Sequence, residues 1–127
     1  MNQLIAIMVG GALGALLRHL IFLLSQRPGG PDFPVGTLVA NLLGCLAIGL
    51  LWYFFEASRL THEWRLFLFT GLLGGFTTFS TFARETVDLV RFGEWKSALA
   101  YVMISNILGL LLVVAGMLLA RRLHQGI

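Results

Sequence analysis

The chain has 127 residues, of which 57% are hydrophobic and only 12% are charged. Soluble proteins carry about a quarter charged residues, and a soluble domain this small buries only about 60–70% of its chain surface. The composition therefore excludes an ordinary soluble enzyme and predicts an all-α membrane protein with a single domain over residues 1–127. The net charge of +3 comes from scattered cations, so we expect no nucleic-acid partner. The one cysteine, Cys45, excludes an internal disulfide framework.

Four stretches are long enough to cross a bilayer, which takes about 20 apolar residues. They cover approximately residues 4–24, 35–55, 64–90 and 98–120. Short polar segments separate them, and the first of these segments holds all three prolines. Aromatic residues that favour the membrane interface stand at the span ends: Trp52, Tyr53, Trp64 and Trp95. The sequence therefore predicts four transmembrane helices in the lipid bilayer.

The first span combines small residues with a basic pair near its end. Gly10 and Gly14 form a GxxxG pair, which lets helix backbones approach closely. Arg18 and His19 stand inside the apolar stretch. Either Arg18 extends along the helix to the membrane surface, or it lines an aqueous vestibule that attracts anions. The residues alone leave both interpretations open for Arg18, whereas His19 is interpreted as an interfacial side chain.

The third span contains an unusual segment, residues 71–82, with the sequence GLLGGFTTFSTF. Adjacent glycines and a run of Thr and Ser weaken an α-helix at the middle of the membrane. We therefore expect the third helix to be broken near its middle. Transporters use such breaks to expose carbonyl groups to ions. A packed glycine kink, with the hydroxyls bonded back to carbonyls, is the alternative.

The charges are nearly balanced across the membrane. With four spans, the cations divide into Arg59, Arg65, Arg121 and Arg122 on one side and Arg18, Arg27, Arg84, Arg91 and Lys96 on the other. Because the positive-inside rule needs an excess on one side, four against five predicts dual topology, unless another signal orients the chain. The carboxylates stand at or beyond the span ends: Asp32, Glu56, Glu63, Glu85, Asp88 and Glu94. A proton-coupled transporter would require one inside a span.

Three motifs together resemble the Fluc (CrcB) family of microbial fluoride channels, and the resemblance covers nearly the whole chain. The first span has GGxxGAxxR from Gly10 to Arg18, and the second has GTLxxNxxG from Gly36 to Gly44. The third span has GGFTTFSTF from Gly74 to Phe82. The last motif is the most specific of the three, and the first would be weak alone.

The resemblance implies an antiparallel, dual-topology homodimer with two fluoride pores, in the inner membrane of the cell. It also implies a structural Na⁺ on the two-fold axis, held by backbone carbonyls of Gly74 and Thr77 from both subunits. The family's pore phenylalanines fall on Phe79 and Phe82, and its pore asparagine falls on Asn41. Its hydroxyl track falls on Tyr101 and Ser105, whereas Gly109, one turn further, lacks a hydroxyl.

These residue types suit fluoride, which is small and strongly hydrated. A pore must replace the lost water bonds, because an uncompensated anion is costly in a low dielectric. The Asn41 amide has two N–H donors, and phenyl rings present positive edges to an anion. Further donors are the hydroxyls of Ser80, Thr81, Tyr101 and Ser105. Since none is a fixed cation, the ion can bind and still leave.

Two other functions compete with a fluoride channel. A small proton-coupled multidrug exporter has a similar size, but it needs a glutamate in the first span, which has no carboxylate. A non-transporting membrane subunit would explain the glycines but not the segment rich in Phe, Thr and Ser. No catalytic triad, metal-ligand spacing or phosphate loop supports an enzyme. Asn106 is interpreted as an interhelical hydrogen-bonding residue, and Phe76 as either a packing or a pore residue.

Overall fold

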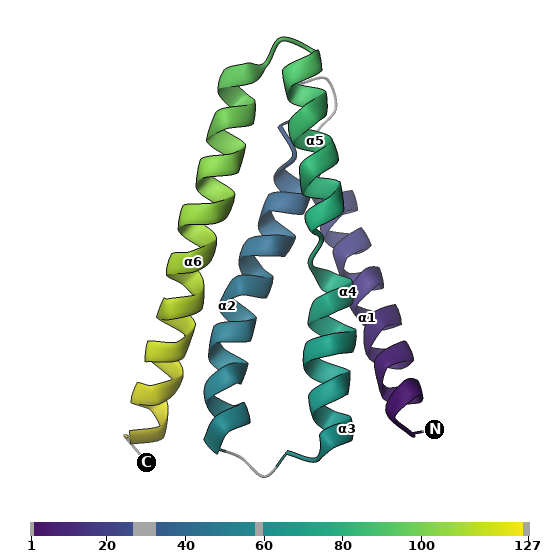
Figure 1. Ribbon diagram of the computed structural model, residues 1–127, viewed down its shortest axis with the longest axis vertical. Coiled ribbons are helices and arrows are strands. Elements are labelled where there is room, and N and C mark those ends of the chain that lie inside the picture. Colours follow the sequence, from purple (N-terminus) through teal and green to yellow (C-terminus); the bar gives the residue numbers. More distant parts are fainter. Residues whose placement is uncertain (1, 27–32, 58–59, 126–127) are drawn as a thin grey trace.

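The computed structural model describes residues 2–26, 33–57 and 60–125, and all the regular secondary structure in them is helical (Figure 1). Arg27, Asp32 and Arg59, which enter the charge analysis, lie outside these residues. The elements in chain order are α1 (Asn2–Ser25), α2 (Val35–Ala57), α3 (His62–Arg65), the π-helix η1 (Leu66–Leu73), α4 (Gly74–Phe76), α5 (Phe79–Arg91) and α6 (Trp95–Gln125).

Four helical stretches are long and apolar enough to cross a membrane. They are Asn2–Ser25, Val35–Glu56, His62–Arg91 and Trp95–Gln125, and each contains or closely matches a span expected from the sequence. The prediction of an all-α protein with four membrane spans is therefore confirmed. The stretch His62–Arg91 differs from the others because it is assembled from α3, η1, α4 and α5.

The spans pack as two pairs. Helices α2 and α6 lie side by side over much of their length, and α1 packs against η1 and α4 (Figure 1). Small residues permit the close contact between α2 and α6, since a Cβ on Gly116 of α6 would lie 2.8 Å from the backbone N of Leu50 on α2. This close pairing brings the inner faces of α2 and α6 together, and both carry residues of the proposed site.

Glycines also let α1 lie directly on the backbone of the third span. A Cβ on Gly10 would lie 2.9 Å from the Leu72 nitrogen, and one on Gly71 would lie 3.0 Å from the Gly10 Cα. Gly14 makes the same kind of contact with the backbone around Leu72. The expectation that Gly10 and Gly14 serve helix packing is thus confirmed, and their partners are residues of η1 and α4.

Most large apolar side chains of the spans point outward. Leu110 is 71% exposed and Met8 is 71% exposed, whereas the buried hydrophobic core among the described residues is a small set: Ala40, Leu73, Leu89, Ala98, Tyr101 and Ala120. In water such a surface would be unfavourable at about 25 cal/mol per Å². The chain therefore needs lipid, or lipid and a partner, around it.

Candidate functional site: the extended threonines of the third span

Thr77 and Thr78 are the two extended residues between α4 and α5. Their φ and ψ angles are −93° and 155° for Thr77 and −151° and 118° for Thr78. Gly74 and Gly75, in contrast, are helical. The β-branched threonines are the residues that prefer extended backbone, whereas Gly75 is needed for packing, because a Cβ there would lie 3.1 Å from the Gly11 Cα.

The side chain of Asn41 holds this extended segment in place. Its Nδ2 donates to the Thr78 carbonyl at 3.1 Å, and its Oδ1 accepts from the Thr78 N–H at 2.8 Å. One amide thus satisfies both backbone groups of a residue that has left the helical pattern. One of the two Asn41 N–H groups is committed to this contact, so a single one is left for an ion.

The same geometry removes the helical partners of two carbonyl groups. In an α-helix the Gly74 carbonyl would accept from the N–H of Thr78, and the Thr77 carbonyl from that of Thr81. Here the Thr78 N–H donates to Asn41, and the Thr81 N–H donates to the Thr78 hydroxyl at 3.3 Å. Carbonyl oxygens are ligands that hard cations accept, so Gly74 and Thr77 fit the Na⁺ site that the resemblance implies.

Three hydroxyl groups gather at the start of α5. Thr78 Oγ1 donates to Thr81 Oγ1 at 3.1 Å and lies 3.4 Å from Ser80 Oγ. Because Thr81 Oγ1 accepts a hydrogen bond from Thr78, the Thr81 hydroxyl can donate its own proton to another group. The structure thus brings Ser80 and Thr81 together beside the extended residues.

Phe79 and Phe82 lie on the same side of α5. Their ring centroids are 5.6 Å apart with an interplanar angle of 47°. Phe79 is 79% exposed, whereas Phe82 is half-buried and packs on Tyr101 with centroids 5.0 Å apart. The two rings therefore connect the protein interior to a surface that lipid or a partner must cover.

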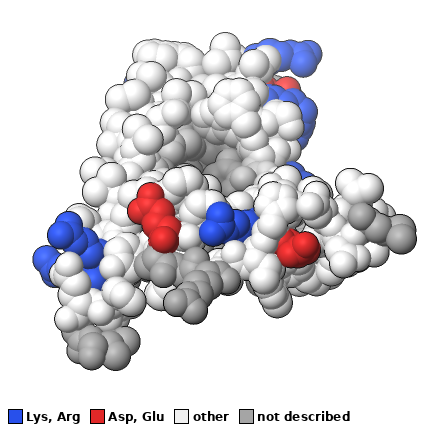
Figure 2. All heavy atoms as spheres, turned by 60° about the horizontal axis from the view of Figure 1, so that its bottom comes forward, with Lys and Arg blue, Asp and Glu red and all other residues white. Residues whose placement is uncertain are grey.

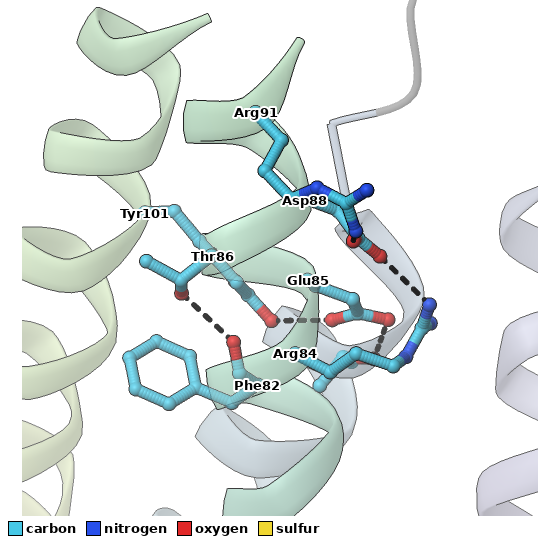
Figure 3. A network of polar contacts seen from close by, with 8 residues as sticks. Phe82, Arg84, Glu85, Thr86, Asp88, Arg91 and Tyr101 are labelled. Atoms are coloured by element: carbon cyan, nitrogen blue, oxygen red, sulfur yellow. Dashed lines mark hydrogen bonds and ion pairs between the residues drawn. The ribbon is translucent and has the colours of Figure 1, made fainter.

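Glu85 joins three helices and was not chosen from the sequence. Its carboxylate accepts a hydrogen bond from Tyr101 OH at 2.8 Å and another from Thr37 Oγ1 at 2.9 Å, which links α5 to α6 and α2 (Figure 3). Tyr101 is fully buried. In the sequence Glu85 is one of the carboxylates near the span ends, but in the structure it points inward; its helical spacing of four from Thr81 is the sequence signal for this orientation.

Ser105 lies one turn beyond Tyr101 on α6. Its Oγ is buried and has no hydrogen-bond partner among the described residues. At the next turn, a Cβ on Gly109 would lie 3.3 Å from the Cys45 Sγ. The Cys45 thiol of α2 therefore lies beside Gly109, the position at which a side-chain hydroxyl would continue the row formed by Tyr101 and Ser105.

Arg18 lines a small hollow of about 190 Å³. The lining residues come from α1, α2, the extended segment and α5, and they include Thr37, Thr78 and Thr81. Arg18 itself is half-buried. Arg18 therefore lies beside the hydroxyl-bearing residues Thr37, Thr78 and Thr81, and its role in a vestibule stays a prediction.

Two remaining residues have simpler surroundings. Asn106 is exposed, and its Nδ2 donates to the Val102 carbonyl of its own helix at 2.8 Å. The sequence predicted an interhelical hydrogen bond for Asn106, but among the described residues its bond is to its own helix. The Phe76 ring faces α2, because a Cβ on Gly44 would lie 3.7 Å from its Cδ1. The Phe76 ring therefore lies beside Gly44.

Comparison with known proteins identifies the family. The model of the family described as "CrcB-like protein, Camphor Resistance (CrcB)" matches residues 5–117. The chain belongs to the CrcB family. It is similar to a protein named fluoride-specific ion channel FluC from Desulfotalea psychrophila, with 50% identity over 94% of this chain and 92% of the relative. FluC proteins of Parabacteroides distasonis and Chloroflexus aurantiacus are 44% and 47% identical, over 97% and 95% of this chain and 96% and 97% of theirs.

The Asn41 contact predicts a large effect of a small substitution. Asn41→Ala leaves the N–H and carbonyl of Thr78 without partners in a water-poor environment, where each unsatisfied group costs about 1–3 kcal/mol. We expect the free energy of unfolding in detergent to fall by about 2–4 kcal/mol. The matched control is Asn106→Ala, which removes only a bond to the residue's own helix and is expected to change stability by less than about 1 kcal/mol. Equal losses in the two variants would contradict the role given to Asn41.

Proposed function

We propose that this chain is a fluoride-selective ion channel that lets fluoride leave the cell passively and so gives resistance to fluoride. Membership of the CrcB family, whose relatives named above are fluoride-specific ion channels, carries this proposal. It makes the protein an ion channel and not an enzyme. Neither the drug exporter nor the non-transporting subunit has support from these relatives.

The donors at the extended threonines support a pore for a small anion. Arg18 in its hollow would attract the ion electrostatically without binding it irreversibly, since the side chain is only half-buried. From there the hydroxyls of Ser80 and Thr81 and the free N–H of Asn41 would replace water in its first shell. The edges of the Phe79 and Phe82 rings would follow, because the ring edge carries positive potential.

The donors of α6 would complete the path. Ser105, whose buried hydroxyl has no partner among the described residues, would be free to donate to the ion. Tyr101 and Thr37 donate to Glu85 in the present arrangement, so they would bind fluoride only by exchanging one acceptor for another. This exchange would conserve the number of hydrogen bonds and keep the passage from becoming a deep energy well.

We further propose that two copies associate as an antiparallel dimer with the third span broken at its centre. Four helices are too few to enclose a polar path, and Phe79, Ser80 and Gly74 are exposed in the single chain. Polar backbone in a membrane must be buried in protein or line a cavity. A second copy would cover these groups, and the balanced cation count allows it to insert in the opposite orientation. We assign the dimer to the inner membrane of the cell, as the resemblance implies.

We also propose a structural Na⁺ at the centre of this dimer, as the resemblance implies. The carbonyls of Gly74 and Thr77 lack their helical donors, and two subunits would bring four such oxygens together. A monovalent cation would satisfy them and reduce their mutual repulsion. Among the described residues no group of three His, Cys, Asp or Glu side chains competes as a metal site. We expect this ion to stay bound while fluoride passes.

Fluoride efflux from proteoliposomes tests the function. When valinomycin and K⁺ supply the counter-current, vesicles that contain the protein should release fluoride and retain chloride. Phe79→Ile and Phe82→Ile should each reduce the fluoride rate at least about tenfold, the effect of a barrier raised by roughly 1.4 kcal/mol, while the dimer peak in size-exclusion chromatography is unchanged. Well-folded protein without fluoride efflux would reject the channel. Full flux in both variants would reject the ring-edge mechanism and leave the channel itself intact.

Dual topology has a separate test. A cysteine-free background with one cysteine in a C-terminal tag should react with a membrane-impermeant maleimide on intact vesicles to roughly half of its total content, because about half of the copies would face each way. The remainder should react only after the vesicles are opened. Complete labelling, or none, before opening would show a single orientation.

The Na⁺ proposal predicts a dependence on one cation. Prolonged dialysis of the purified protein into a large organic cation, such as N-methyl-D-glucamine, should dissociate the dimer or abolish fluoride efflux. Returning Na⁺ should restore both, since binding to the assembled state shifts the equilibrium by mass action. Dimer stability and efflux that are the same in Na⁺ and in the organic cation would exclude a structural Na⁺.

A further inference from the structure

Arg65 lies far from the fluoride path, at the end of the molecule where α2 ends and the third span begins. Its Cζ lies 4.3 Å from the centroid of the Phe55 ring, which is the stacked arrangement that a guanidinium adopts on an aromatic face. Phe55 in turn packs on Trp52 and Phe69, with centroids 5.0 Å and 5.1 Å away. Trp52, Phe55 and Phe69 thus form an aromatic cluster, and the Arg65 guanidinium stacks on its Phe55 ring.

Arg65 forms no ion pair in the part of the chain that the structure describes. Its Nε is buried and lacks a hydrogen-bond partner there. Glu56, the acidic residue next to Phe55, accepts from the Trp52 indole at 3.0 Å instead. The ion pairs between described residues both involve Asp88, at the other end of the molecule. A partly buried guanidinium without an anion is expensive.

The surroundings of Arg65 are those of a membrane interface. Trp52 and Trp64 are 39% and 55% exposed, and exposed tryptophans at span ends are typical of the headgroup level. Figure 2 views the molecule obliquely from this end, where basic and acidic groups alternate along the near edge of the molecule. Phosphate groups of lipids are the anions present at this depth.

We propose that Arg65, together with the aromatic cluster of Trp52, Phe55 and Phe69, binds the phosphate of an anionic phospholipid. The exposed part of the guanidinium would donate two parallel N–H bonds to the phosphate oxygens, the geometry that arginine favours with such groups. The rings would contact the glycerol and upper acyl region. Basic groups between transmembrane helices are a known kind of lipid headgroup site. This inference needs only that the chain lies in a membrane, so failure of fluoride efflux would leave it standing.

The test compares thermal unfolding in two kinds of vesicle, phosphatidylcholine alone and phosphatidylcholine mixed with phosphatidylglycerol, at the same ionic strength. Tryptophan fluorescence reports the unfolding midpoint. Because a ligand that binds only the native state stabilises it, we expect phosphatidylglycerol to raise the midpoint by about 3 °C or more. Arg65→Gln should abolish this rise. Arg122→Gln removes the same charge from an exposed position at the same end, and it should retain the rise.

Each other outcome overturns the proposal. An equal rise in Arg65→Gln and the native protein would show that the lipid acts elsewhere, and an equal loss in Arg122→Gln would show a diffuse surface charge effect. A loss of stability in Arg65→Gln that is the same in both kinds of vesicle would show that Arg65 does not select the anionic lipid. Inorganic phosphate added to phosphatidylcholine vesicles should not reproduce the rise; if it does, the site binds free phosphate and not lipid.

If Arg65→Gln does not assemble, Arg65→Lys provides the same comparison. It keeps the charge but cannot donate two parallel bonds while it lies flat on Phe55. We expect it to lose at least half of the rise, and an undiminished rise would exclude a specific guanidinium site.

Discussion

The double hydrogen bond between the Asn41 side chain and the Thr78 backbone is the contact on which the site depends. It permits an extended residue inside a membrane-spanning stretch without an unpaired N–H or carbonyl at that residue. In hydrocarbon such pairing is a requirement rather than an advantage. Once Thr78 is held in this way, the carbonyls of Gly74 and Thr77 lose their donors and the Thr78 hydroxyl becomes the cap of α5. The exposed carbonyls proposed for the cation and the hydroxyl cluster at the start of α5 therefore both depend on that single amide.

The sequence predicted the spans because each is a long apolar run bounded by polar residues, a pattern that needs no knowledge of neighbours. It also predicted an irregular segment in the third span, residues 71–82. It assigned that irregularity partly to Gly74 and Gly75, which are helical. Glycine weakens an isolated helix, but here both lie where α1 must approach closely, and tertiary packing overrides the intrinsic preference. The sequence did not predict the π-helix Leu66–Leu73, because an apolar run has the same composition in an α-helix and in a π-helix.

The candidate site was only partly accessible to the same reasoning. Phe79, Phe82, Ser80 and Thr81 are close in the chain, so their proximity could be foreseen. Glu85 was missed because its partners Tyr101 and Thr37 are 16 and 48 residues away in the chain. Only the fold shows that a carboxylate near a span end turns inward. The contact of Asn41 with the Thr78 backbone could not be predicted for the same reason, because the two residues are 37 positions apart in the chain.

The extended residues Thr77 and Thr78 also place two helix ends opposite each other inside the molecule. The carbonyl end of α4 carries partial negative charge and the amide end of α5 partial positive charge, because peptide dipoles align along a helix. In an antiparallel dimer the two-fold axis would duplicate both ends at the same depth. One interruption would therefore create neighbouring regions of opposite polarity, favourable to a cation on one side and to an anion on the other. Neither region needs a charged side chain, since the backbone itself supplies the potential.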